Sequence, residues 1–106
     1  MRIILTHSAR SDLFLLEENL NYFNGDGTFF VNQITKEMTR LSTFPKIGPS
    51  LQTKITIPTD YRFLTFKFTN KQIFIIIYRV DEKAKIIYIN RVFDARTNYL
   101  YTLFQD

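Results

Sequence analysis

Residues 61–93 read YRFLTFKFTNKQIFIIIYRVDEKAKIIYINRVF, and this stretch decides the fold. Three runs of apolar, aromatic and β-branched residues, YRFLTFKF, QIFIIIYRV and AKIIYINRVF, are separated by the short polar segments TNK and DEK. Such runs are typical of an antiparallel meander. Both alternating sets of positions in each run are largely apolar, whereas a sheet with one solvated face alternates apolar and polar residues. We therefore predict that both faces of this sheet are covered.

Two helices are predicted before the meander, after a short strand over residues 1–5. Ser8 is a suitable N-cap for a helix over residues 9–23, and Asp12 is then well placed in its first turn. A second helix is predicted over residues 28–43, and Phe-Pro after it prevents its continuation. Apolar residues recur at helical spacing in both: Leu13, Leu16, Leu20 and Phe23 in the first, and Phe30, Ile34, Met38 and Leu41 in the second. The two helices would form a hairpin that packs on one face of the sheet.

The remaining segments complete an α+β fold. Leu51–Ile57 is either a short edge strand or an extended connection. Asp94 is a candidate N-cap for a short C-terminal helix that carries Leu100, Leu103 and Phe104. We predict one domain over residues 1–106, with an N-terminal strand and a helical hairpin packed on an antiparallel meander, and a short helix at the end.

Composition excludes several classes of protein. With 45% hydrophobic and 16% aromatic residues, the chain is not disordered. It has no cysteine, which excludes disulfides and thiolate metal sites. No apolar run approaches the roughly 18 residues of a membrane span, and the start of the chain lacks the apolar core of a signal peptide. We expect a cytoplasmic protein that needs no metal or cofactor. The net charge of +4 is compatible with an acidic partner, with nucleic acid, or with solubility alone.

The turns of the meander predict which residues lie opposite one another. Centring the first turn on Asn70 places Arg62 across from Tyr78. Centring the second turn near residues 82–83 places Tyr78 across from Ile87. A one-residue slip or a β-bulge would reverse part of this assignment.

The same pairing predicts the face on which each arginine lies. It places Phe74 across from Arg91, so that Arg62, Tyr78 and Arg91 share one face, with Arg79 on the other. Arginines on an apolar face either pair with carboxylates such as Asp94 or Glu82, or snorkel to the rim, or line an open groove.

In the groove interpretation, Arg62, Arg91 and Arg96 offer positive charge to an acidic ligand. The apolar part of the predicted groove is the face that carries Leu64, Phe66, Phe68, Phe74, Ile76, Tyr78, Ile87 and Ile89. An exposed patch of this size usually marks a partner site, and an amphipathic helix or an added strand of another protein would suit it.

Catalytic arrangements are sparse in the sequence. His7 is the single histidine, and a structural role at the start of the first helix is favoured over catalysis. Asp94 is a candidate general base as well as an N-cap. Tyr99 is a candidate for proton donation or base stacking, or for simple packing. No catalytic triad, phosphate loop or metal cluster is visible, and GDGTFF has the chemistry of a turn rather than of a nucleotide-binding loop.

The order of these segments resembles the RelE/ParE superfamily, the toxins of type II toxin–antitoxin modules. The resemblance spans nearly the whole chain. Its motifs are THSARSDL after the first strand, LSTFPKIG after the second helix, the Tyr61-Arg62 pair, IFIIIYRV, and the ending IYINRVFDARTNYLYTLF. It implies the fold derived above and a cognate antitoxin bound across the apolar face.

Activities diverge within that superfamily, so the fold alone does not determine the function. RelE-type members cleave mRNA on the ribosome with a cluster of basic residues, and here Arg62, Arg91, Asp94, Arg96 and Tyr99 would be the candidates. Ile75 stands about where those nucleases carry an arginine, and Asp94 stands where many relatives carry a histidine. The nuclease set is therefore incomplete.

The ending RVFDARTNYLYTLF and the strand IFIIIYRV are more similar to the ParE branch. Members of that branch inhibit DNA gyrase without chemistry of their own. The resemblance thus favours a gyrase inhibitor in a hetero-oligomer with its antitoxin, with ribosome-dependent mRNA cleavage as the alternative.

Overall fold

The computed structural model describes residues 1–104 and confirms the predicted order of elements. The elements are β1 (Arg2–Leu5), α1 (His7–Asn24), α2 (Gly27–Thr43), the 3-10 helix η1 (Leu51–Thr53), β2 (Arg62–Lys67), β3 (Ile73–Asp81), β4 (Ile86–Asp94) and α3 (Tyr99–Phe104). Residues 51–57 form η1 and a loop, and the only sheet-like feature next to them is an isolated bridge between Ser50 and Arg62. Neither alternative, edge strand or extended connection, predicted the 3-10 helix at the start of this segment.

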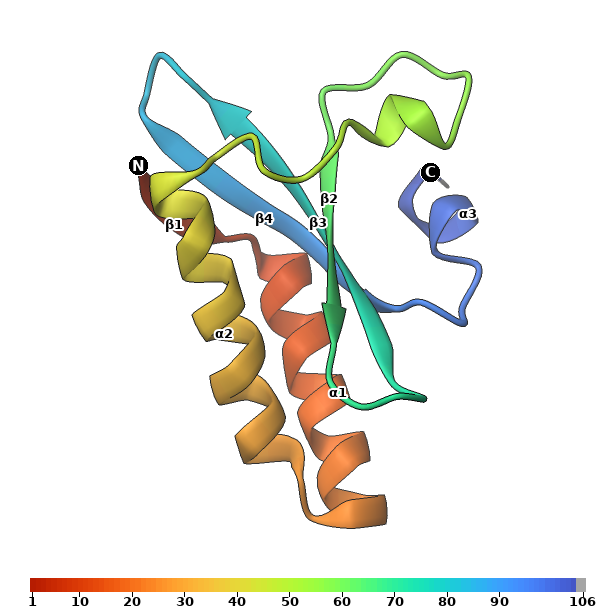
Figure 1. Ribbon diagram of the computed structural model, residues 1–106. Helices are drawn as coiled ribbons and strands as arrows, with labels where there is room; N and C mark the ends of the chain where they lie inside the picture. Colours follow the sequence, from red (N-terminus) through yellow and green to blue (C-terminus); the bar gives the residue numbers. More distant parts are fainter. Residues whose placement is uncertain (105–106) are drawn as a thin grey trace.

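The four strands form one sheet in the order β1-β4-β3-β2. β1 pairs in parallel with β4, and the three strands of the predicted meander are antiparallel. In Figure 1, α1 and α2 lie side by side along one side of the sheet, while α3 lies on the other side of β3 and β4 from them. The architecture is α+β, as predicted.

α1 begins two residues earlier than predicted, because Thr6 caps it instead of Ser8. The Oγ1 of Thr6 accepts a hydrogen bond from the backbone N–H of Ala9 at 3.2 Å. Both hydroxyl residues are good caps, so side-chain preference alone does not choose between them. As a consequence, Asp12 lies in the second turn of α1. Gly25 ends the helix with a φ of 73°, a left-handed conformation that glycine adopts without strain.

The apolar stripes of the helices are confirmed except at one position. The α2 stripe of Phe30, Ile34, Met38 and Leu41 is buried, as are Leu13 and Leu20 on α1, with Leu16 packed beside them. Phe23 is 72% exposed, so its assignment to the core was wrong. In Figure 1 the turn between the helices projects beyond the sheet, so the last turn of α1 has little sheet to pack against.

The larger core lies between the helices and the face of the sheet that was predicted to be open. That prediction was wrong. The residues predicted to line a groove are buried or partly buried against α1 and α2: Leu64, Phe66, Phe68, Phe74, Ile76, Tyr78, Ile87 and Ile89. Phe30 of α2 is at the centre of this core, with its ring centroid 4.6 Å from that of Phe74.

The opposite face of the sheet has a smaller cover. Ile75, Ile77 and Phe93 are buried there together with Leu51 of η1. Their neighbours are the partly buried Ile55, Tyr61, Phe63 and Ala95, and the α3 residues Tyr99, Leu100, Leu103 and Phe104. Both faces of the sheet are therefore covered by this chain itself, over at least part of their area.

The pairing of β2 with β3 was predicted correctly, and Arg62 lies across from Tyr78. Tyr78, however, lies across from Ile89 and not Ile87. Because Ile87 and Ile89 are two residues apart, they point to the same face of the sheet, and this shift in register leaves the predicted faces unchanged.

A β-bulge in β4 has a larger effect on the predicted faces. Ile77 pairs with Arg91 while Tyr78 pairs with Ile89, so Asn90 has no partner in the ladder. Beyond the bulge the side chains of β4 change sides, and Phe74 lies across from Asp94 instead of Arg91. The prediction that Arg62, Tyr78 and Arg91 share one face was therefore wrong.

Candidate functional site

Arg62 is a structural clamp on the loop that follows α2. Its Nη1 donates a hydrogen bond to the carbonyl oxygen of Gly48 at 2.8 Å. The hydroxyl of Tyr78 accepts from the backbone N–H of Gly48 at 2.9 Å, and burial raises the pKa of this tyrosine. A Cβ at Gly48 would lie 2.3 Å from the carbonyl oxygen of Phe63, so the loop fits closely against β2. Arg62 and Tyr78 thus fix a loop in the structure, where the sequence predicted an open groove.

Arg91 is tied to α1 through Asp12. Its Nε and Nη2 donate to the two carboxylate oxygens of Asp12 at 2.8 and 2.9 Å. The same carboxylate accepts the backbone N–H of Val92 at 2.9 Å. The guanidinium also lies over the ring of Phe93, 4.6 Å from its centroid. The hydrogen bonds to Asp12 raise the pKa of Arg91. The interpretation that its charge is paired was correct, but the carboxylate comes from α1, not from Asp94 or Glu82.

Asp94 pairs with Arg96 in the turn after β4. Its carboxylate accepts from the backbone N–H, the Nε and the Nη2 of Arg96, at 2.9, 3.2 and 2.9 Å. The Arg96 guanidinium lowers the pKa of Asp94 and keeps this group ionised. A general base at neutral pH works best with a pKa near 7, so this environment does not favour that role. Asp94 also does not cap α3, which begins at Tyr99, so the N-cap prediction was wrong.

Tyr99 packs on the sheet. Its ring stacks on that of Phe93 with centroids 5.9 Å apart and an interplanar angle of 28°. This corresponds to the simple packing role among the alternatives for this residue.

The five candidate catalytic residues do not form one constellation. Arg62 lies on the face of the sheet that the helices cover, and Arg91 lies on the opposite face. Each of the three arginines donates to an oxygen of this chain. Among residues 1–104, no group of three or more His, Cys, Asp or Glu side chains is arranged to hold a metal ion. Within the same residues, no helix is long and apolar enough to cross a membrane.

The structure instead brings together basic and aromatic side chains that the sequence did not single out. On the face opposite the helices, the guanidinium of Arg79 lies 4.9 Å from the ring centroid of Tyr88. Arg79 also lines a hollow of about 210 Å³ together with Thr59, Asp60 and Tyr61. The alternation of β3 placed Arg79 on a different face from Tyr78, which was correct. The hollow depends on the loop before β2, which has no periodicity to read.

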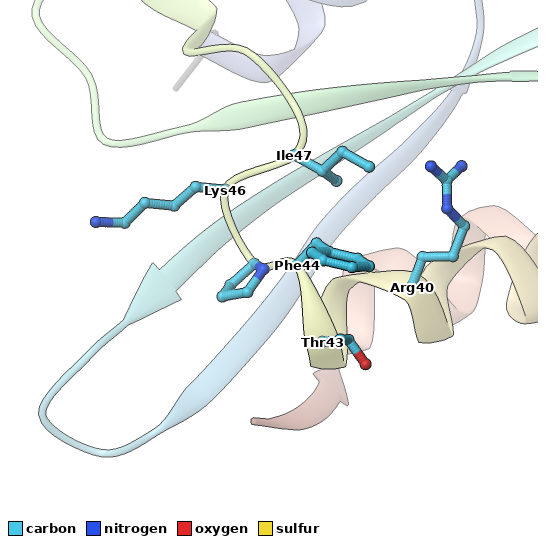
Figure 2. A pocket seen from close by; sticks show the side chains of 6 residues that line it. Arg40, Thr43, Phe44, Lys46 and Ile47 are labelled. Carbon is cyan, nitrogen blue, oxygen red and sulfur yellow. The ribbon is translucent and has the colours of Figure 1, made fainter.

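A second feature that the sequence missed is an apolar depression at the end of α2 (Figure 2). It has a volume of about 500 Å³ and is lined by Arg40, Thr43, Phe44, Pro45, Lys46 and Ile47. Phe44 is 60% exposed and Ile47 is 40% exposed. Lys46 forms an ion pair with Glu82, which ties this loop to the turn between β3 and β4.

Comparisons with known proteins agree with this fold. The family model for the ParE toxin of the type II toxin–antitoxin system parDE matches residues 3–99. A chain in a solved structure of the chromosomal ParDE toxin–antitoxin system from P. aeruginosa is 21% identical in sequence, with a TM-score of 0.71. The match covers 89% of this chain and 95% of that chain.

Two solved E. coli structures are also similar. The toxin in the intact RelBE toxin–antitoxin complex is 14% identical with a TM-score of 0.62, and covers 91% of this chain and 98% of that chain. The isolated RelE toxin is 12% identical with a TM-score of 0.63, and covers 96% and 92% respectively. At these identities the likenesses establish the shared fold alone. A comparison with curated protein sequences finds no match.

Proposed function

This chain belongs to the ParE family of type II toxin–antitoxin toxins, and on that premise we propose that it inhibits DNA gyrase until a cognate antitoxin binds it. Gyrase lies in the bacterial cytoplasm, so the same proposal places the protein there. In a cell that loses the antitoxin, the toxin would then stop growth by binding gyrase, and the toxin itself would catalyse no reaction.

The observation that carries this proposal is the separation of the candidate nuclease residues. Phosphodiester cleavage needs several charged groups around one phosphate. Here Arg62 and Arg91 lie on opposite faces of the sheet, and Asp94 and Arg96 neutralise each other. Ile75, in the first half of β3, is a buried apolar side chain at about the position where the resemblance to RelE-type nucleases implies an arginine. These features favour a binding toxin over a nuclease.

The test is a supercoiling assay with purified gyrase and purified toxin. We expect the toxin to stop supercoiling and to leave cleaved DNA bound to the enzyme. We also expect induced expression to arrest division and to activate the DNA-damage response. Unchanged supercoiling at a large excess of correctly folded toxin would refute gyrase as the target.

Ribosome-dependent mRNA cleavage is the second candidate, and one observation favours it. Arg79, Tyr88 and Tyr61 place positive charge and aromatic rings near each other on the face opposite the helices. Nucleic acids bind to such surfaces through phosphate contacts and base stacking. The test is to map 5′ ends of cellular messages after induction. Cuts at the ribosomal A site that disappear in Arg79→Ala would support cleavage, whereas intact messages in a growth-arrested cell would exclude it.

We further propose a hetero-oligomer with the antitoxin. The net charge of +4 favours an acidic antitoxin segment. Of the residues predicted to contact it, Arg96 is exposed, with 73% of its side chain accessible. We therefore keep Arg96 as a candidate contact. An Arg96→Glu variant that binds purified antitoxin as tightly as the unmodified toxin does would remove it from the interface.

A further inference from the structure

α1 is apolar on two sides, and only one of them is explained by the fold. Its inner side carries Ala9, Leu13 and Leu20, which are buried against the sheet and α2. Its outer side carries three large apolar side chains that remain in solvent: Phe14 at 58%, Leu15 at 62% and Tyr22 at 83% exposure. α2 has no such stripe, because Phe29, at 59% exposure, is its single exposed large apolar side chain and its other large apolar residues are buried or half-buried.

The three exposed side chains lie together. Leu15, Glu18 and Tyr22 are spaced by three and four residues, so they follow one side of the helix, and Phe14 lies one turn before Glu18. We call Phe14, Leu15, Glu18 and Tyr22 the outer stripe of α1. Leu15, Glu18 and Tyr22, with Asn19 and Asn21, line a shallow depression on this side. The outer stripe is therefore a continuous surface with the spacing by which helices dock on partners.

The C-terminal part of the α1 backbone, which carries the end of the outer stripe, is packed closely against α2. At the end of α1, the side-chain oxygen of Asn21 accepts the backbone N–H of Gly27 at 2.7 Å. A Cβ at Gly27 would lie 2.2 Å from the carbonyl oxygen of Glu17, so the two helices are in close contact at their turn. A helix whose backbone is already ordered loses little backbone conformational entropy on binding, which favours affinity.

The outer stripe is flanked by acidic side chains along most of its length, and Arg10, one turn before Phe14, is the one Lys or Arg side chain of α1. Residues 11–35 contain four acidic residues, Asp12, Glu17, Glu18 and Asp26, and neither Lys nor Arg. Asp12 is paired with Arg91, which leaves the other three on or near the helical hairpin. The rest of the chain holds all fourteen Lys and Arg and six acidic residues, a balance of +8. The part of the hairpin around the turn between the helices is thus acidic on a basic protein, while Arg10, Lys36 and Arg40 lie toward the other ends of the two helices.

We propose that the outer stripe of α1 docks a protein segment that is both apolar and positively charged. The apolar side chains would be covered by the apolar residues of the segment, and Glu17, Glu18 and Asp26 would face its Lys and Arg side chains. The same charges oppose nucleic acid and anionic membranes. They also oppose symmetric pairing of two copies, because each Glu18 would then face an identical acidic surface.

A pair of synthetic peptides tests the chemistry of this surface. Both are amphipathic helices of equal length with the same leucine pattern, one with lysine and the other with glutamate at the polar positions. We expect the lysine peptide to bind about tenfold more tightly, since the exposed Glu18 and Asp26 and the half-buried Glu17 each add a weak ion pair. Amide chemical shifts of uniformly labelled toxin should change within residues 11–26. Equal binding of the two peptides, shift changes centred on another element, or concentration-dependent dimerisation of the toxin would each overturn the proposal.

A second experiment, which rests on the proposed function, tests whether the toxin uses the surface. The double variant Leu15→Ser, Tyr22→Ser should keep the unfolding temperature of the unmodified toxin, because both side chains are exposed. The concentration that it needs to inhibit gyrase should rise at least about tenfold. The matched control Ile57→Ser changes an apolar residue that is 55% exposed and lies off the helices, and should inhibit normally. If unmodified toxin does not inhibit gyrase, the proposed function fails and the peptide experiment still decides this inference. If toxin and double variant inhibit equally, the docking role is wrong.

Discussion

Replacing Asp12 by alanine should destabilise the protein by about 2–3 kcal/mol. Asp12 accepts three hydrogen bonds, two from Arg91 and one from the Val92 N–H, and its side chain is only 12% exposed. A hydrogen bond to a charged group contributes about 1.5–3 kcal/mol when it is protected from water. Arg91 is 27% exposed and recovers part of its hydration after the substitution, which lowers the sum. For a domain of this size, the loss corresponds to roughly 10–20 °C in unfolding temperature.

Urea denaturation followed by circular dichroism measures this loss. Asp12→Asn keeps an acceptor for Val92 but loses the charge, so it should be destabilised by about 1 kcal/mol. Glu37→Ala is the control, because its ion pair with Arg40 is exposed and within one helix, and it should change stability by about 0.5 kcal/mol or less. If Asp12→Ala and Glu37→Ala are equally stable, Asp12 does not hold α1 to β4 in the way its geometry indicates.

Three further substitutions test the other internal contacts. Tyr78→Phe should destabilise by about 1–2 kcal/mol in urea denaturation, because the N–H of Gly48 loses its acceptor; an unchanged midpoint would show that water replaces the hydroxyl. Gly48→Ala should cost more than about 2 kcal/mol, since its Cβ would meet the Phe63 carbonyl; a stable variant would mean that the loop can move. The lowered pKa of Asp94 adds stability that is present above the unfolded-state pKa of about 4 and is lost as the pH falls through the lower pKa of the folded state. Asp94→Asn should remove that part of the acid sensitivity, and identical acid titrations of the two proteins would contradict the role of Arg96.

The elements of this fold were readable from sequence because the helices and strands have clear periodicity. The spacing of Phe30, Ile34, Met38 and Leu41 has one interpretation, and all four residues are buried. The turn at Asn70 likewise fixed the register of β2 on β3. The first residue of α1 was harder to predict, because Thr6 and Ser8 both carry a hydroxyl that can cap the helix.

Hydropathy alone could not predict which face of the sheet the helical hairpin covers, because both faces of the meander are apolar. A weaker signal was present in the polar residues. Thr65, Lys67, Arg79 and Asp81 all fall on the face with Ile75 and Ile77, whereas the other face of β2 and β3 is apolar along nearly its whole length. The more uniformly apolar face needs the larger cover, and the helical hairpin is the larger cover. Counting polar residues on each face would have favoured the observed arrangement.

The position of Arg91 depended on a bulge that the sequence does not mark. Asn90 is tolerated in a regular strand as well as in a bulge, and no glycine signals the irregularity. The bulge lies where the pairing of β1 with β4 ends and α1 begins beside β4. Asp12 accepts the N–H of Val92 at this edge. A contact between residues so far apart in sequence leaves no periodic trace.

The same contacts explain why the family is easier to recognise than the target. The ending RVFDARTNYLYTLF carried much of the resemblance, and its charged residues have internal partners: Arg91 binds Asp12, and Asp94 binds Arg96. Its aromatic residues Phe93 and Tyr99 stack on each other. Such a motif specifies how the chain folds, and many activities are compatible with one fold. Side chains that do not stabilise the fold, foremost the outer stripe of α1, are therefore where differences between targets should be sought.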